Sequence, residues 1–164
     1  MIQSYLRAFQ IGVIAGMRAA VAPALLSHKL VRTIPTKQPQ KPVHYLAQPP
    51  VSIGLNVLAG AELIGDKFPG APDRTVPAQF IGRIASGATC GAFLSEVEGN
   101  EAPFGAIAGG LGAVAGTLLF FNLRRWLNRE ANLPDAAVGL AEDALAVGLG
   151  WQVVNSIEPA AKPV

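Results

Sequence analysis

The amino-acid sequence predicts an all-α integral membrane protein, a polytopic bundle of about five transmembrane helices. Its 164 residues are 51% hydrophobic and only 15% charged, whereas soluble domains carry about 25% charged residues. The stretch 102–123 contains no charge, and as a helix rising about 1.5 Å per residue it would cross the ~30 Å core of a bilayer. The length suits one bundle over residues 1–157, followed by a tail, 158–164, that we expect to be disordered.

The first predicted span covers residues 2–30 and carries Arg18 near its middle. This arginine interrupts the apolar run and argues against a signal peptide. Pro23 is compatible with a membrane helix because neighbouring helices can satisfy the carbonyl that it frees. Residues 31–50 are basic and rich in proline, which favours an extended linker over a helix.

The second and third spans are predicted at residues 51–68 and 78–95. Glu62 and Asp66 lie one turn apart in the second span and therefore share a face. A segment rich in Pro and Gly ends this helix. The third span contains Arg83 near its start and a pair of glycines, Gly87 and Gly91, which would let another helix approach closely.

The fourth and fifth spans are predicted at residues 102–123 and 134–156. Glycines recur in the fourth span at three- and four-residue spacing, which predicts a closely packed helix face. The span is followed by Trp126 and several arginines, which suit a membrane interface. The fifth span contains Glu142 and Asp143 within an apolar run.

Two parts of the chain resemble each other. Residues 12–26 and 105–119 are identical at nine of fifteen positions, and the pair Ala61-Glu62 has a counterpart in Ala141-Glu142. With five spans, this match implies an inverted repeat of spans 1–2 and 4–5, as in many transporters. If the segment 78–95 does not cross fully, the bundle has four spans and the repeat is parallel. Basic residues are divided almost evenly between the two sides, so orientation is not predicted.

Six charged residues within the predicted spans are the candidate substrate or ion path. Each would cost about 2.5–3.5 kcal/mol at the bilayer centre, so we expect pairing of Arg18 and Arg83 with Glu62 and Glu142. The acids could bind a cation or a proton, or the cluster could be an ion-pair network that fixes helix register. The six residues are Arg18, Glu62, Asp66, Arg83, Glu142 and Asp143.

Residues 65–75 offer Lys67 and Arg74 as contacts to a lipid headgroup or phosphate, although no phosphate-loop motif is present; a simple turn is the alternative. Cys90 is the single cysteine, which leaves no intrachain disulfide and no cysteine-based metal site. We find no enzyme motif and expect neither a cofactor nor a metal. A net charge of +2 does not indicate a nucleic-acid partner.

Three stretches are similar to an uncharacterised bacterial family of small integral membrane proteins, catalogued as domain of unknown function 4126. They are Gly16-Met17-Arg18-Ala19, the segment from Glu62 to Arg74, and Glu142-Asp143-Ala144; Arg83 followed by Ser86-Gly87-Ala88 also fits. The resemblance covers about residues 6–154. It implies a membrane location and brings no activity with it.

From the sequence we expect a small transporter or channel for an ion or small polar solute. The alternative is a non-transporting scaffold or lipid-binding protein that assembles through Gly/Ala helix faces. The expected partners are the lipid bilayer and a second copy of the chain, in a dimer whose subunits could be antiparallel. We expect no enzyme activity and a location in the bacterial inner (cytoplasmic) membrane.

Overall fold

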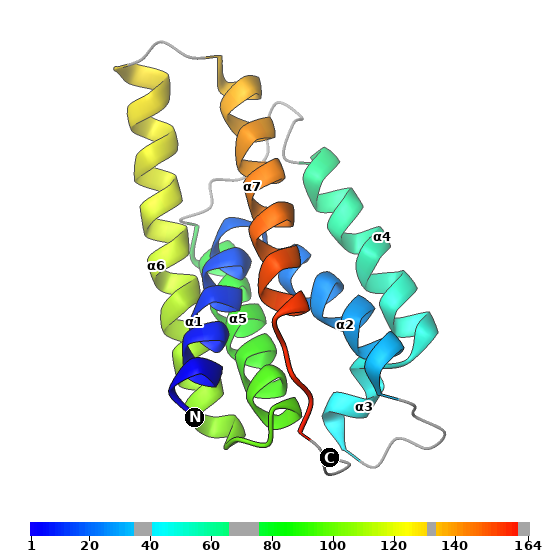
Figure 1. Cartoon of the computed structure of the whole chain (residues 1–164). Helices are drawn as coiled ribbons and strands as arrows, with labels where there is room; N and C mark the ends of the chain where they lie inside the picture. Colours follow the sequence, from blue (N-terminus) through cyan, green and yellow to red (C-terminus); the bar gives the residue numbers. More distant parts are fainter. Residues whose placement is uncertain (35–40, 66–75, 131–133, 161–164) are drawn as a thin grey trace.

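The computed structural model describes residues 1–34, 41–65, 76–130 and 134–160, and these form helices without a strand. The predicted all-α class is therefore confirmed for the described residues. The helices are α1 (Ile2–Met17), α2 (Val21–Thr33), α3 (Pro42–Leu46), α4 (Pro49–Gly65), α5 (Pro77–Val97), α6 (Ala102–Arg129) and α7 (Asp135–Asn155). Helix α1 starts and helix α7 ends at the same end of the molecule (Figure 1).

Helices α1, α5 and α6 form the tightly packed centre of the fold. Gly12 of α1 lies against the backbone of Gly109 in α6, and Gly16 lies against Ala113 and Gly116. Residue numbers rise together on these two helices, so α1 and α6 are parallel. In contrast, Gly87 and Gly91 of α5 meet Gly109 and Gly105 in reverse order, so α5 and α6 are antiparallel. Only glycine allows backbones to approach this closely.

The first predicted span, 2–30, is wrong as a single helix. Helix α1 ends at Met17 and α2 begins at Val21. The chain reverses between them, so that α1 rises from the N-terminus and α2 returns toward the same end (Figure 1). Pro23 lies in the first turn of α2, where a missing backbone N–H is tolerated. The proline that we expected within a continuous helix instead accompanies the start of a new one.

Helices α4 to α7 lie close to the other four predicted spans, but a bundle of five membrane-crossing helices is not confirmed. Among the described residues, two helices, α6 and α7, are by length and composition apolar enough to cross a membrane. Helix α4 has 17 residues, which corresponds to about 25 Å. The inverted repeat is likewise not confirmed, because it requires opposite directions for the matched segments and α1 runs parallel to α6.

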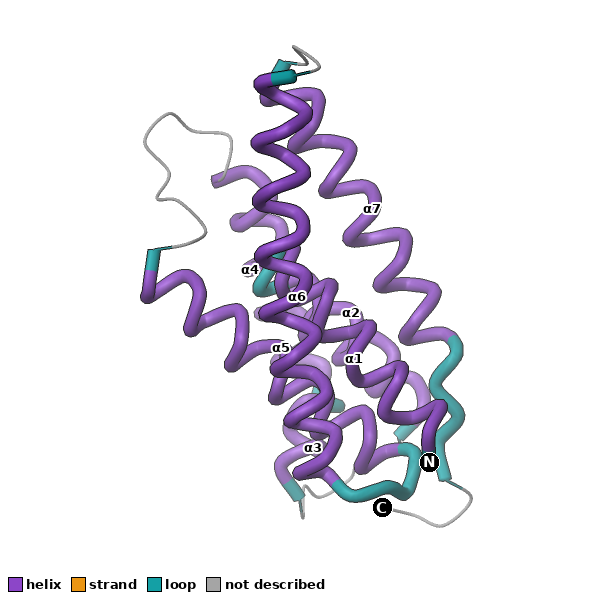
Figure 2. The backbone as a smooth tube through the Cα atoms, turned by 90° about the vertical axis from the view of Figure 1, so that its left-hand side faces the viewer, coloured by secondary structure: helices purple, strands orange, loops and turns teal. Residues whose placement is uncertain are grey.

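Apolar and charged side chains are distributed in an unusual way over the outer helices. Ile53 on α4, Leu111 on α6 and Leu140 on α7 are 65%, 60% and 56% exposed, whereas Arg18 and Arg83 are each 1% exposed. Helix α4 lies at one edge of the bundle in Figure 1, and α7 lies at one edge in Figure 2. Four charged side chains, Arg18, Arg83, Glu142 and Asp143, are therefore buried in the described part of the molecule, while large apolar side chains lie on its surface.

Candidate functional site

The candidate site is the interruption between α1 and α2, at residues 18–20. At the end of α1, the backbone carbonyls of Gly16 and Met17 accept hydrogen bonds of 2.9 and 2.7 Å from Nη1 of Arg83. The hydroxyl of Thr117 also donates to the Gly16 carbonyl, at 3.2 Å. A helix carries partial negative charge at its C-terminal end, so the guanidinium supplies both the missing donors and a favourable charge.

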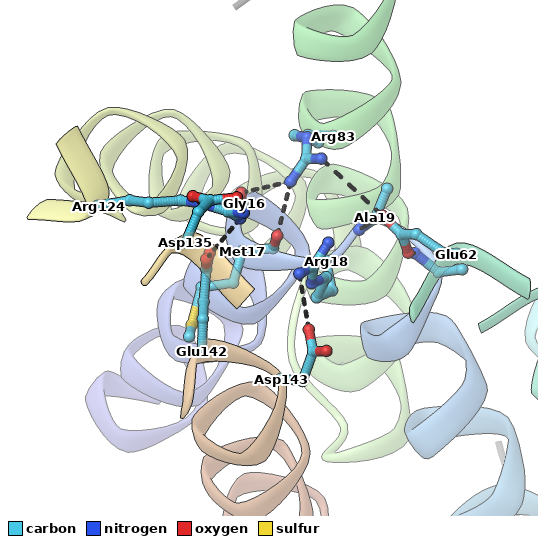
Figure 3. A network of polar contacts seen from close by, with 11 residues as sticks. Gly16, Met17, Arg18, Ala19, Glu62, Arg83, Arg124, Asp135, Glu142 and Asp143 are labelled. Carbon is cyan, nitrogen blue, oxygen red and sulfur yellow. Dashed lines mark hydrogen bonds and ion pairs between the residues drawn. The ribbon is translucent and has the colours of Figure 1, made fainter. Parts of the chain in front are cut away.

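At the start of α2, free backbone N–H groups need hydrogen-bond acceptors, and Glu62 of α4 supplies them. Its two carboxylate oxygens accept the backbone N–H groups of Ala19 and Ala20 at 2.8 and 2.7 Å. An anion is stabilised at a helix N-terminus, where free N–H groups converge. Glu62 and Arg83 also face each other, with Oε1 and Nη2 3.9 Å apart. One ion pair therefore caps both inner helix ends (Figure 3).

The remaining backbone acceptor at the interruption is the carbonyl of Ala19. In a continuous helix this carbonyl would receive the N–H of the residue four positions later, which is Pro23 and has none. In the structure Ala19 accepts a hydrogen bond of 2.6 Å from the hydroxyl of Ser86. Helix α5 thus supplies both Arg83 and, three residues later, Ser86 to the same break.

Arg18 belongs to the break itself and points toward α7. Its Nη2 lies 2.6 Å from Oδ1 of Asp143. Arg18 is 1% exposed and Asp143 is 8% exposed. Removing one partner of such a buried pair leaves an uncompensated charge, which is strongly destabilising. The pair therefore holds the centre of α7 against the break (Figure 3).

A second charged group lies where α6 and α7 approach their connecting segment. Arg124 makes a bidentate contact to Asp135 at 2.8 and 2.7 Å, and its Nη1 lies 3.7 Å from Oε2 of Glu142. Asn128 also donates to Asp135, at 2.7 Å. Bidentate arginine–carboxylate pairs have strong directional geometry, so this group fixes the start of α7 relative to α6.

The structure brings together four of the six candidate path residues: Arg18, Glu62, Arg83 and Asp143. Of the expected pairing of Arg18 and Arg83 with Glu62 and Glu142, the structure contains one contact, Arg83 with Glu62. The expected partner of Arg18 is corrected, because Arg18 pairs with Asp143. Glu142 is buried but pairs with Arg124, since it lies one residue earlier on α7 and points to another side of the helix. Asp66, Lys67 and Arg74 lie outside the described residues.

Sequence reasoning missed Ser86, Thr117 and Arg124 as members of these networks. For Ser86 a signal was available, because Pro23 leaves one carbonyl without its helical donor and a nearby hydroxyl can replace it. Arg124 was assigned to the interface by its position after the apolar run. Within the described part of the chain, no group of three or more His, Cys, Asp or Glu side chains is arranged to hold a metal ion.

A groove of about 390 Å³ reaches the break from the side of α2, α4 and α5. Ala19, Ala20 and Ser86 form its polar end, and the rest of its wall is mainly apolar and includes Leu58 and Phe93. The groove therefore ends beside the backbone groups that Glu62 and Ser86 satisfy.

Fold and site together define a helical protein built around the helical hairpin of α1 and α2, whose tip at residues 18–20 is capped by charged side chains from α4 and α5. The chain belongs to the family described as domain of unknown function DUF4126, whose pattern it matches over residues 6–156. This match confirms the family resemblance seen in the sequence. No curated protein and no solved structure matches the chain.

Proposed function

We propose that this chain is an integral membrane protein that passes an ion or a small polar solute along the break between α1 and α2. In this arrangement α4, α5, α6 and α7 cross the bilayer, and α1 with α2 forms a re-entrant pair. The distribution of side chains supports membrane insertion. Ile53 and Leu111 would be solvated by lipid at no cost, whereas in water large exposed apolar patches are unfavourable.

The observation that carries the transport proposal is the capped break. At membrane depth, irregular backbone is found only where protein buries it or where it lines a polar cavity. An unbroken helix would satisfy the same backbone groups without any buried charge. Here Arg83 and Glu62 hold two helix ends apart at a site close to a groove. Many transporters place their substrate sites where a membrane helix is interrupted and its backbone groups are exposed to the solute, and the hairpin tip offers backbone groups of the same type.

The four charges at the break suggest how a solute could pass. Arg18, Arg83, Glu62 and Asp143 sum to zero formal charge, and each contact involves a group that can exchange partners. A cation or proton reaching Glu62 would weaken its hold on Ala19 and Ala20, and an anion could take the place of the carboxylate there. The flux measurement therefore uses both cations and an anion, so that it determines the sign of the solute's charge.

The test is flux into proteoliposomes, with internal dyes for protons, potassium and halide as the probes. We expect flux in the unaltered protein and at least about tenfold slower flux in Glu62→Gln and Asp143→Asn, because a 1.4 kcal/mol change in a barrier is tenfold in rate. Glu101→Gln is the matched control, since Glu101 is an exposed acid outside the break. Unchanged flux in both site variants would remove the site from the path.

A scaffold is the second candidate function, and one observation favours it. On α4, Gly54 and Gly60 face open space, so that another helix could approach this outer surface. Gly87 and Gly91 of α5 and Gly105 and Gly109 of α6 instead lie against neighbouring helices inside the fold. We propose a homo-oligomer through α4 in this case. Absence of flux for all three ions, together with a disulfide-linked dimer of the Gly54→Cys variant, would favour the scaffold.

A further inference from the structure

A second groove, of about 520 Å³, lies between α2 and α4, away from the break. Its walls combine two kinds of side chain. His28, Arg32, Ser52 and Asn56 are polar, whereas Ile53 and Val57 are apolar and 65% and 67% exposed. A volume of this size is within the range of small-ligand sites. The mixture indicates an amphiphilic occupant.

The charge of this groove is positive. Arg32 and His28 are one helical turn apart on α2 and therefore share a face, and none of the described residues that line the groove is acidic. Elsewhere at this end of the molecule, the basic side chains of Arg7 and Lys41 pair with Glu98 and Glu96. Over the described ranges, neither His28 nor Arg32 is in an ion pair with an acidic side chain.

Arg32 marks the outer end of the groove, and along α4 a polar pair, Ser52 and Asn56, runs beside an apolar pair, Ile53 and Val57. Arg32 is in the last turn of α2, and Pro49 starts α4 beside it. The indole of Trp151 lies against His28, with ring centroids 5.8 Å apart, and tryptophan is typical of the headgroup depth. Asn56 donates to the carbonyl of Ser52 at 2.7 Å, which holds the amide on the groove wall.

From this arrangement we infer that the groove between α2 and α4 binds the headgroup of an acidic phospholipid. The phosphate contacts Arg32 and His28, Ser52 and Asn56 hydrogen-bond the polar headgroup, and an acyl chain follows Ile53 and Val57 along α4. Arginine suits a phosphate because its planar donors match the oxygens. The inference rests on the proposed membrane insertion and is independent of transport.

Trp151 provides a local probe of this groove. The chain has two tryptophans, so Trp126→Phe leaves Trp151 as the only one. We would reconstitute this variant in phosphatidylcholine vesicles and add phosphatidylglycerol or phosphatidylcholine brominated on the acyl chains, which quenches nearby indoles. We expect brominated phosphatidylglycerol to reach half-maximal quenching at a mole fraction about fivefold lower than brominated phosphatidylcholine. This ratio corresponds to the attraction of about 1 kcal/mol that one basic side chain contributes at an anionic membrane surface.

Arg32→Gln and Lys29→Gln, each in the Trp126→Phe background, form the matched pair. Both remove one positive charge from the same part of α2, but Lys29 does not line the groove. We expect Arg32→Gln to remove the preference for the acidic lipid and Lys29→Gln to retain it. Equal loss in both variants, with both still folded by thermal unfolding, would overturn the site in favour of general surface attraction.

Two further outcomes separate the sources of the phosphate. Millimolar glycerol phosphate that reverses the quenching would show that the groove takes a soluble anion, and would overturn the lipid assignment. Equal quenching by the two brominated lipids would overturn it as well. Flux is measured separately, with Glu62→Gln. A loss of transport without a change in lipid preference leaves this inference standing. A loss of lipid preference in Arg32→Gln without a change in flux leaves the proposed function standing.

Discussion

At the scale of single residues, Arg83 has the most demanding position in the molecule. It is 1% exposed, donates to two backbone carbonyls of α1 and faces the carboxylate of Glu62. Its planar guanidinium can serve several acceptors from one fixed position, which an ammonium group cannot do in the same geometry. The break between α1 and α2 therefore depends on this side chain more than on any local sequence feature.

Arg83→Gln should destabilise the protein by about 3–5 kcal/mol, since the carboxylate of Glu62 and two carbonyls lose a buried partner. Arg83→Lys should recover part of this loss because it keeps the charge. The measurement is unfolding by a denaturing detergent in mixed micelles, followed by circular dichroism. Arg125→Gln is the control, because Arg125 is exposed and its loss should change stability by less than about 0.5 kcal/mol.

Equal stability of the Arg83→Gln and Arg125→Gln variants would contradict the capping role.

The charge pairs inside the molecule could be predicted from the sequence only in part. That buried arginines meet buried acids followed from the cost of an isolated charge in lipid. Which acid meets which arginine did not follow, because Glu142 and Asp143 are adjacent on α7 and point in different directions.

At the scale of helices, glycine positions decide how closely α1, α5 and α6 can pack. A methyl group added at Gly12 would overlap the carbonyl oxygen of Gly109, whereas Gly54 on α4 has open space beside it. The similarity between residues 12–26 and 105–119 has its physical explanation here. The two segments pack against each other, and each must present small side chains at helical spacing to the other.

Gly12→Ala and Gly54→Ala make the same chemical change at these two sites, with opposite expected results. Gly12→Ala should cost about 1–3 kcal/mol or more by overpacking. Gly54→Ala should be neutral or stabilising by up to about 1 kcal/mol, because alanine restricts the unfolded chain and favours helix. Unfolding in mixed micelles measures both. A stability loss at Gly54 as large as at Gly12 would mean that the α4 surface is also covered.

At the scale of the whole molecule, several charged side chains are buried between the helices while many large apolar side chains lie on the helix surfaces. This distribution was the basis for proposing membrane insertion, and it predicts which positions are shielded from water. In a Cys90→Ala background, Ile53→Cys and Leu111→Cys should react with a charged maleimide at least about tenfold more slowly than Glu101→Cys in lipid nanodiscs, where both membrane faces are accessible. Comparable rates at all three positions would show that water reaches the helix faces.

Much of the fold was predictable because apolar runs are long and their ends are marked by proline, glycine or charge. Helix α5 was predicted at 78–95 and observed at Pro77–Val97, and α7 was predicted at 134–156 and observed at Asp135–Asn155. The failure at residues 18–20 has a clear cause. Hydropathy treats 2–30 as one apolar stretch, and no glycine marks the reversal within it.

By itself, the sequence determined that the chain is helical and apolar, and that the few charged residues within its apolar segments must be paired. These properties follow from composition and from the energy of burying charge, which do not depend on how the helices are arranged. Only the tertiary structure decided that the first apolar stretch breaks at Arg18, that α1 and α6 are parallel, and that Asp143 completes the site. A helix break is stabilised by donors and acceptors from distant helices, and such contacts exist only once the chain has folded.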